Sequence, residues 1–335
     1  MFSIERKGEE SRKLAYFDEN CVGCGICTDV CPTSSLRLGP LVPIARGLID
    51  MDLVSVNADS CVFCGLCSVA CPFEALELSI DGQLIDAMDS YPVWDVKCEV
   101  DGDDCIYCGR CNRVCPQDAI LFERKLPNPA DLVVGEMDID EDSCIYCGFC
   151  ADMCPPGAIS IRNVPTSGND VLNNTIEVDL SKCVYCGVCK RVCPEGAIRQ
   201  ICSTCMYSEE IKVPEITGST FISRKSCVSC SWCAEICPED AITITKPFEG
   251  TLEIVESDEK VCKGESCHAC QDVCPCNAVE IVDNRADTNL DFCNLCGACI
   301  TACPQNIRKL SRTSMKLNNI NSESWKEILN GLIGK

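Results

Sequence analysis

Short segments in which apolar and polar residues alternate flank dense cysteine loops along this chain. Segments such as IEVDLSKC and MDLVSVNADSC lead into a loop, and segments such as EALEL, DAILF, GAISI and DAITI follow one. Alternation with period two favours half-buried strands, and the Asp, Glu and Gly residues between the segments favour turns. Each unit is therefore predicted to run as strand, cysteine loop, short helix and strand.

The C-terminal segment SWKEILNGLIGK follows a helical period instead. Ser324 and Glu327 have the spacing of a capping box, which predicts that a helix begins there. Its apolar residues fall on one helical face, namely Trp325, Ile328, Leu329, Leu332 and Ile333. This face either folds back onto the protein's own last repeat or docks a partner, and folding back is the favoured expectation.

No run of the sequence approaches the roughly 18 consecutive apolar residues that a membrane span requires. The most apolar stretch, LVPIARGLIDMDLVSV, is interrupted by Arg46 and two aspartates. The N-terminal MFSIERKGEESRKL lacks the apolar core of a secretory signal. We therefore expect a cytoplasmic protein without a membrane span.

The formal net charge of −22 repels the phosphate backbone of nucleic acids, so we expect no nucleic-acid partner. Aromatic residues make up 5% of the chain, and much of the 46% apolar fraction is cysteine itself. A large conventional core cannot be built from this composition. Whatever the cysteines bind must fill part of the interior, so folding and metal binding are expected to be one event.

Of the 36 cysteines, 32 fall into eight similar motifs. Seven motifs read C-x2-C-x2-C-x3-C-P, and the seventh in order has two extra residues between its first and second cysteines. Proline follows the fourth cysteine in all eight, and glycine follows the second in six. The first to eighth motifs begin at Cys21, Cys61, Cys105, Cys144, Cys183, Cys227, Cys262 and Cys293.

This spacing suits a [4Fe-4S] cluster. Three thiolates within seven residues can wrap a cluster if the backbone curls tightly, which the glycine permits, while the fourth cysteine points away. In two-cluster ferredoxins the fourth cysteine of each motif ligates the other cluster, so motifs work in interlocked pairs. Zinc is the alternative, but a tetrahedral zinc site needs neither the third cysteine nor the cysteine before proline.

Eight motifs therefore predict an α+β protein of four tandem two-cluster ferredoxin modules with eight [4Fe-4S] clusters. Consecutive pairing uses every motif, although the sequence leaves a non-sequential pairing open. The long connections at residues 32–60 and 116–143 have enough apolar residues to pack on neighbouring modules or a partner. The expected modules are residues 1–85, 86–168, 169–247 and 248–315, followed by the C-terminal amphipathic helix, residues 316–335.

Four cysteines lie outside the motifs: Cys98, Cys202, Cys205 and Cys276. They could form one further metal site if they converged, but buried free thiols are the favoured interpretation. His268, the only histidine, lies in the seventh motif at the position where six other motifs have glycine. It could tune or replace a ligand, although an ordinary loop residue is favoured.

The sequence has no Gly-rich phosphate loop, dinucleotide fingerprint or nucleophile–histidine pair, so no catalytic residue is predicted. Many redox centres without a substrate pocket favour a conductor of single electrons. We expect a non-catalytic electron-transfer subunit of an oxidoreductase complex. A free or hydrogenase-associated carrier or store is the alternative, and an enzyme built on the four spare cysteines is a third hypothesis.

The whole chain resembles the archaeal polyferredoxins. The motif number and the segment GPLVPIARGLIDMDLVSVNADSCVFCGLCSVACPFEALEL are similar to the polyferredoxin subunit of tungsten or molybdenum formylmethanofuran dehydrogenase. This resemblance implies a role in methanogenesis, conducting low-potential electrons to a catalytic subunit that reduces CO2 to formylmethanofuran. The implied partners are the other subunits of that complex, with ferredoxin or a hydrogenase/heterodisulfide reductase assembly as the electron donor.

The ferredoxin pattern, transferred to matching positions, also implies the cluster ligands. Each set takes three cysteines from one motif and the fourth from its consecutive partner. The implied sets are Cys21, Cys24, Cys27 and Cys71; Cys61, Cys64, Cys67 and Cys31; Cys105, Cys108, Cys111 and Cys154; Cys144, Cys147, Cys150 and Cys115; Cys183, Cys186, Cys189 and Cys237; Cys227, Cys230, Cys233 and Cys193; Cys262, Cys267, Cys270 and Cys303; and Cys293, Cys296, Cys299 and Cys274.

Overall fold

The computed structural model describes residues 2–127, 136–165, 172–201 and 216–333. Within these residues, short strands and short helices surround the cysteine loops, which confirms the predicted α+β fold class. No helix of the described part is long and apolar enough to cross a membrane. Each cysteine loop feeds a helix of four or five residues, and these helices pack in pairs.

The first module joins the first and second motifs, because helix α1 (Ile26–Asp29) packs against α3 (Leu66–Val69). Its main sheet has the order β1-β2-β5-β6, and all its neighbouring strands are antiparallel. These strands are β1 (Phe2–Lys7), β2 (Ser11–Tyr16), β5 (Leu76–Ile80) and β6 (Gln83–Leu84). A second pair is β3 (Leu36–Leu38) with β4 (Val54–Val56), and the 3-10 turns are Asp18–Asn20 and Ile85–Ala87.

The last module joins the seventh and eighth motifs through helices α8 (Ala269–Asp272) and α9 (Ala298–Ala302). Strand β16 (Phe248–Ile254) pairs with β19 (Arg308–Met315), and β17 (Val279–Val282) pairs with β18 (Arg285–Thr288). The longer spacing between the first two cysteines of the seventh motif contains a 3-10 turn, Gly264–Ser266.

The middle of the chain departs from the expected order. Helix α4 (Arg110–Val114) of the third motif packs against α7 (Trp232–Glu235) of the sixth. Helix α5 (Phe149–Asp152) of the fourth motif packs against α6 (Val188–Val192) of the fifth. The expected modules 86–168 and 169–247 are therefore wrong: one module lies inside another.

Strand pairing is the physical reason for this nesting. In the outer module, which we call the split module, β9 (Ile120–Lys125) pairs with β14 (Thr217–Ile222), and β8 (Cys98–Val100) pairs with β15 (Ile242–Ile244). In the module between them, the inserted module, β10 (Glu136–Ile139) pairs with β13 (Ile198–Ile201), and β11 (Ile159–Pro165) pairs with β12 (Leu172–Val178). Each module thus closes its own antiparallel ribbons.

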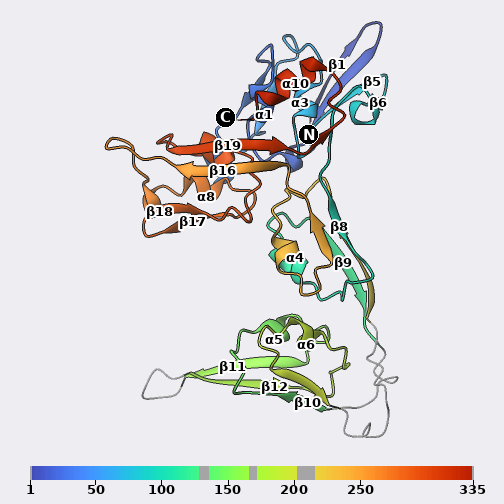
Figure 1. Ribbon diagram of the computed structural model, residues 1–335, viewed down its shortest axis with the longest axis vertical. Coiled ribbons are helices and arrows are strands. Elements are labelled where there is room, and N and C mark those ends of the chain that lie inside the picture. The colour runs from blue at the N-terminus through green and yellow to red at the C-terminus, as the bar shows by residue number, and fades with distance from the viewer. Residues whose placement is uncertain (1, 128–135, 166–171, 202–215, 334–335) are drawn as a thin grey trace.

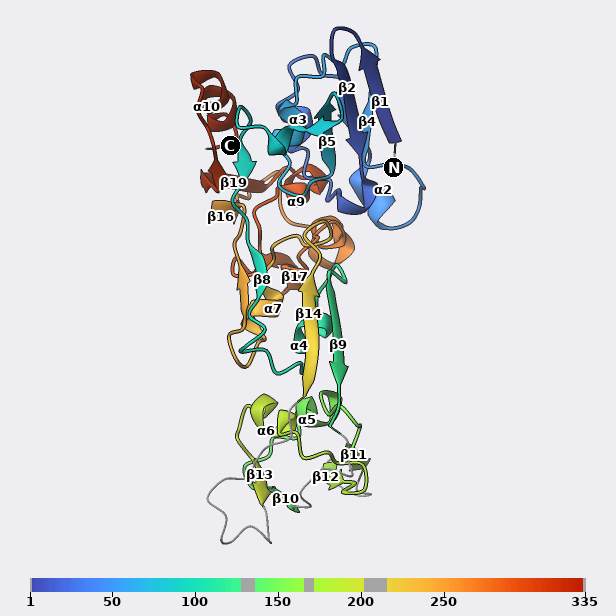
Figure 2. The same ribbon diagram turned by 90° about the vertical axis from the view of Figure 1, so that its right-hand side faces the viewer.

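The four modules form an elongated molecule (Figure 1). The first and last modules lie together at one end, the split module follows, and the inserted module lies at the far end, as the turned view in Figure 2 also shows. The connection at residues 32–60 contributes to this assembly through helix α2 (Leu41–Ala45). Directly after α2, Arg46 donates a 2.7 Å hydrogen bond to Asp272 and a 2.5 Å bond to the carbonyl of Cys267 in the last module. This connection packs on a neighbouring module, as expected.

The C-terminal segment differs from its expected bounds. Strand β20 (Leu317–Asn318) pairs with β7 (Val93–Trp94), and helix α10 spans only Glu323–Asn330. Its N-cap is Ser322, which accepts a hydrogen bond from the backbone N–H of Trp325, so the cap lies two residues before the expected one. Leu329 and Leu332 are buried where the first and last modules meet. The helix does fold back, onto two modules and not only the last.

Candidate cluster-binding sites

Each cysteine loop reverses direction through left-handed backbone conformations. The residue after the second cysteine has a positive φ in every motif, and six of these residues are glycine. The two exceptions are Ser231, with φ 72°, and His268, with φ 56°. The loop therefore imposes this geometry even where the sequence departs from glycine. At Ser231 and His268 the backbone conformation is strained, because the Cβ lies close to a carbonyl oxygen. His268 lies at the N-cap of α8, and its Nδ1 is 3.1 Å from the Oε1 of Gln271.

Replacing His268 with glycine should stabilise the protein, because glycine adopts this conformation without a Cβ clash. We expect a gain of about 0.5–1 kcal/mol, since glycine also adds freedom to the unfolded chain. Anaerobic denaturant titration of the loaded protein measures it. Gly148→Ala is the matched control: a Cβ there meets nothing within 4 Å, so its expected loss of about 1 kcal/mol is conformational. A destabilised His268→Gly variant would show that the histidine makes a compensating contact.

Four cavities are each lined by three cysteines of one motif and the fourth cysteine of the motif paired with it. In the split module, Cys227, Cys230 and Cys233 share a cavity with Cys115 of the third motif. The other three cavities contain Cys61, Cys64, Cys67 and Cys31; Cys262, Cys267, Cys270 and Cys303; and Cys293, Cys296, Cys299 and Cys274. The exchange of fourth cysteines between paired motifs is thus built into the fold.

The other four sets of cysteines are identified by the effect of nearby thiols on one another's pKa. Burial raises the pKa of Cys24 to about 12, with a further increase from nearby Cys71. Burial also raises the pKa of Cys108, to which Cys237 adds, and the pKa of Cys186, to which Cys154 adds. Cys193 contributes in the same way, after burial, to the raised pKa of Cys150.

The nested pairing therefore corrects four of the expected sets. The expected exchanges of Cys115 with Cys154, and of Cys193 with Cys237, are wrong because those motifs lie in different modules. The structure brings together Cys105, Cys108, Cys111 and Cys237; Cys227, Cys230, Cys233 and Cys115; Cys144, Cys147, Cys150 and Cys193; and Cys183, Cys186, Cys189 and Cys154.

Backbone N–H groups point at the cysteine sulfurs, which is what a thiolate-bound cluster requires. The fourth cysteine of a motif typically accepts a bond from the residue four positions later, as from Ala119 to Cys115 at 3.2 Å and from Ala158 to Cys154 at 3.2 Å. First cysteines accept similar bonds, as from Leu295 to Cys293 at 3.4 Å. Such donors stabilise negative charge on sulfur and raise cluster reduction potentials. The donor sets fit [4Fe-4S] clusters.

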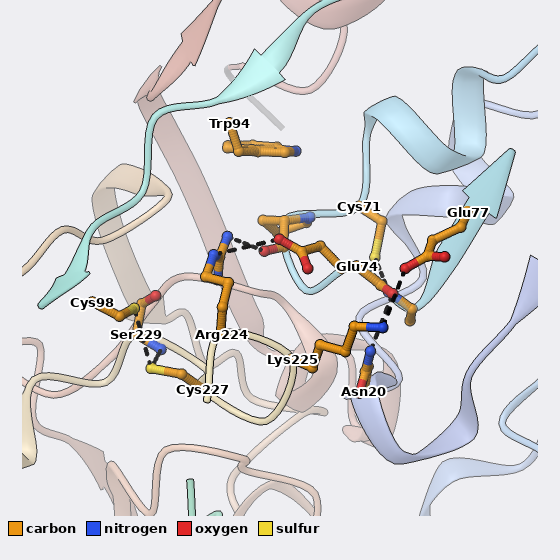
Figure 3. Close-up of polar contacts among 12 residues, drawn as sticks. Asn20, Cys71, Glu74, Glu77, Trp94, Cys98, Arg224, Lys225, Cys227 and Ser229 are labelled. Atoms are coloured by element: carbon orange, nitrogen blue, oxygen red, sulfur yellow. Dashed lines mark hydrogen bonds and ion pairs between the residues drawn. The ribbon is translucent and has the colours of Figure 1, made fainter. Parts of the chain in front are cut away.

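No three His, Cys, Asp or Glu side chains of the described part converge closely enough to bind a single metal ion. Two of the spare cysteines have separate surroundings. Cys98 donates to the sulfur of Cys227 at 3.4 Å (Figure 3), and Cys276 is 1% exposed among residues of the first, last and split modules. Cys202 and Cys205 lie outside the described residues.

Three ligand sets meet in one buried cluster of side chains, which we call the junction. It contains Cys71 of the first module, Cys230 of the split module and Cys296 of the last. The rings of Trp232 and Phe292 stack across it, with centroids 3.5 Å apart. Sequence patterns gave no sign of the junction, because its members lie far apart along the chain.

Charged residues tie the split module to the first module beside this junction (Figure 3). Arg224 donates to the carbonyl of Pro72 at 3.0 Å and lies 3.5 Å from a carboxylate oxygen of Glu74. The next residue, Lys225, lies 3.7 Å from Glu77. Pro72 directly follows the ligand Cys71, and Arg224 lies three residues before Cys227, so this contact links two ligand loops.

A second contact joins the inserted module to the split module. Met153, Val188 and Val192 form a buried cluster of side chains, against which Cys108 and Cys186 pack. Cys108 belongs to the split module and Cys186 to the inserted module. Ligand sets therefore follow one another from the far end of the molecule to the junction.

Comparison with known proteins defines the class. Profiles of a 4Fe-4S dicluster domain match residues 20–75, 143–197 and 226–278, and two further dicluster profiles match residues 60–120 and 97–155. A 4Fe-4S binding domain profile matches residues 286–309. The chain therefore belongs to the proteins built from repeated 4Fe-4S dicluster domains, and the expected [4Fe-4S] chemistry is confirmed.

A particular relative is the polyferredoxin protein FwdF of Methanocaldococcus jannaschii, which is 51% identical over 137 residues. This match covers 41% of the present chain and 39% of that relative, so it spans less than half the length of either. A chain in the solved formate dehydrogenase–heterodisulfide reductase–formylmethanofuran dehydrogenase complex of Methanospirillum hungatei superposes with a TM-score of 0.61 at 28% identity. That superposition covers 99% of the present chain and 88% of the other. The expected resemblance to this polyferredoxin type is confirmed.

Proposed function

We propose that this chain is the polyferredoxin subunit of a formylmethanofuran dehydrogenase complex in the cytoplasm. Its eight cysteine sets would hold eight [4Fe-4S] clusters, which supply one-electron transfer at low potential. The electrons serve the reduction of CO2 to formylmethanofuran in the catalytic subunit, and the chain has no active site of its own. The donor is ferredoxin or a hydrogenase/heterodisulfide reductase assembly.

The observation that carries this proposal is the structural similarity to one chain of the solved complex, which extends over 99% of the present chain. The succession of ligand sets supports it physically. Cys186 of the inserted module and Cys108 of the split module pack against the same cluster of side chains, and the junction connects the split module to the first and last modules. A path with several ends suits a protein that connects different partners.

A free or hydrogenase-associated carrier is the second candidate. An apolar face on the C-terminal helix that docks a partner would argue against it. The structure removes that objection, because Leu329 and Leu332 are buried within the chain itself. The hypothesis of an enzyme built on the spare cysteines has no such support, since Cys98 and Cys276 pack in different clusters of side chains.

Anaerobic purification from the native source tests the proposal. We expect about 32 iron and 32 sulfide per chain, from eight cubanes, together with a partner that contains tungsten or molybdenum. The same iron without such a partner would favour the free or hydrogenase-associated carrier. Zinc with little sulfide would exclude the cluster assignment.

A further inference from the structure

One motif replaces a core residue with a charge. The residue five positions after the fourth cysteine is a buried Leu, Ile or Val in the first seven motifs. In the eighth motif it is Arg308, which is only 4% exposed. The apolar counterparts are Leu36, Leu76, Ile120, Ile159, Ile198, Ile242 and Val279.

The guanidinium of Arg308 has a protein partner for only one of its three nitrogens among the described residues. Its Nη2 donates to the hydroxyl of Thr288, but Nε and Nη1 are buried without a hydrogen-bond partner among the described residues. A buried, unpaired cation is costly, and an anionic group nearby would offset that cost. Burial by itself lowers the pKa of Arg308, but the nearby Cys299, Cys270 and Cys303 outweigh this effect and raise the pKa.

Those cysteines place Arg308 between the two ligand sets of the last module. Arg308 lines the cavity formed by Cys262, Cys267, Cys270 and Cys303. Cys299 belongs to the neighbouring set with Cys274. A cation at this place faces bound clusters that are anionic in every oxidation state.

Arg312 lies four residues further along strand β19, on the same face as Arg308, and shows what an ordinary structural arginine does here. Its side chain donates to the carbonyl of Leu295 at 3.0 Å and to that of Cys296 at 2.6 Å, which clamps the eighth loop. Arg124 makes the corresponding bonds to Tyr107 and Cys108 in the split module. Arg308 makes no such bond to a loop carbonyl, so its place is not explained by loop packing.

We propose that Arg308 raises the reduction potential of the clusters in the last module. This inference rests on the proposed function, because it requires clusters in the seventh and eighth sets. Reduction adds one negative charge to a cluster, and a buried positive charge stabilises that state more than the oxidised one. The cluster held by Cys262, Cys267, Cys270 and Cys303 should respond most.

The test is an EPR-monitored redox titration of the full-length chain carrying Arg308→Leu. Leucine occupies this position in two other motifs, so the variant should fold and keep its iron. We expect the reduction equilibrium of at most two of the clusters to become about tenfold less favourable, equivalent to about 59 mV for a one-electron couple. Arg308→Lys should keep most of the wild-type potential, because it retains the charge.

Arg285→Gln is the matched control. Arg285 lies in the same module, but its side chain is 55% exposed and pairs with Glu256 at 3.3 Å. Its loss removes one charge and should leave the titration unchanged. Full iron content with unaltered midpoints in Arg308→Leu would overturn this inference alone, as would equal shifts in the leucine and lysine variants. An unaltered chain lacking iron in its last module would overturn the proposed eight-cluster function as well.

Discussion

Residues 136–201, expressed alone, are expected to fold and bind about eight iron and eight sulfide, the content of two cubanes. This segment contains the whole inserted module: helices α5 and α6 pack on each other, and its strands pair only among themselves. Both ligand sets of the module, including the exchanged Cys154 and Cys193, lie within it. Iron and sulfide analysis after anaerobic reconstitution measures the result.

The fragment 86–168 is the matched control, because it has the same number of motifs in consecutive order. It contains the third and fourth motifs, whose helices belong to different modules. Cys108 would lack Cys237, and Cys150 would lack Cys193, so neither set is complete. We expect it to bind little iron and remain unfolded, since folding and metal binding are coupled. Equal loading of both fragments would contradict the nested arrangement.

Leu329→Ala is expected to release the C-terminal helix and weaken the contact between the first and last modules. Leu329 is 1% exposed and packs in one cluster with Ile26, Ala70 and Phe248. Removing a buried leucine side chain to alanine costs about 2–5 kcal/mol. A helix of eight residues is too short to persist without such packing. Hydrogen exchange across residues 319–333 should rise, and the unfolding midpoint should fall.

Leu48→Ala provides the comparison, because Leu48 is 71% exposed and contributes no buried core. A surface substitution of this kind should change stability by no more than about 0.5 kcal/mol. Similar exchange rates at residues 319–333 in the Leu329→Ala and unaltered proteins would show that other contacts hold the helix.

Short sequence patterns predicted most of the local structure of each cysteine motif and its flanking strands. The cysteine spacing predicted the tight loop, and the structure shows the same left-handed position in every motif, including Ser231 and His268, where glycine is replaced. The alternation in segments such as DAITI predicted strands, and β15 (Ile242–Ile244) forms there. The capping box at Ser324 was misplaced because Ser322 offers a cap two residues earlier. The capping-box pattern favours Ser324, because Glu327 lies three residues after it, but the residue that caps the helix is Ser322, which has Trp325 at that position.

The sequence by itself determined that this protein binds [4Fe-4S] clusters in ferredoxin-type units, because three closely spaced thiolates, a glycine and a proline are local requirements. Only the tertiary structure decided which motif completes which cluster, since every fourth cysteine is alike and strand pairing across 90 or more residues, as between Ile120 and Ile222, selects its partner. The junction of Cys71, Cys230 and Cys296, and the charge of Arg308 between two ligand sets, follow from that same packing. Contacts between residues distant in sequence carry no local signature, which is why repeats that look equivalent have different neighbours.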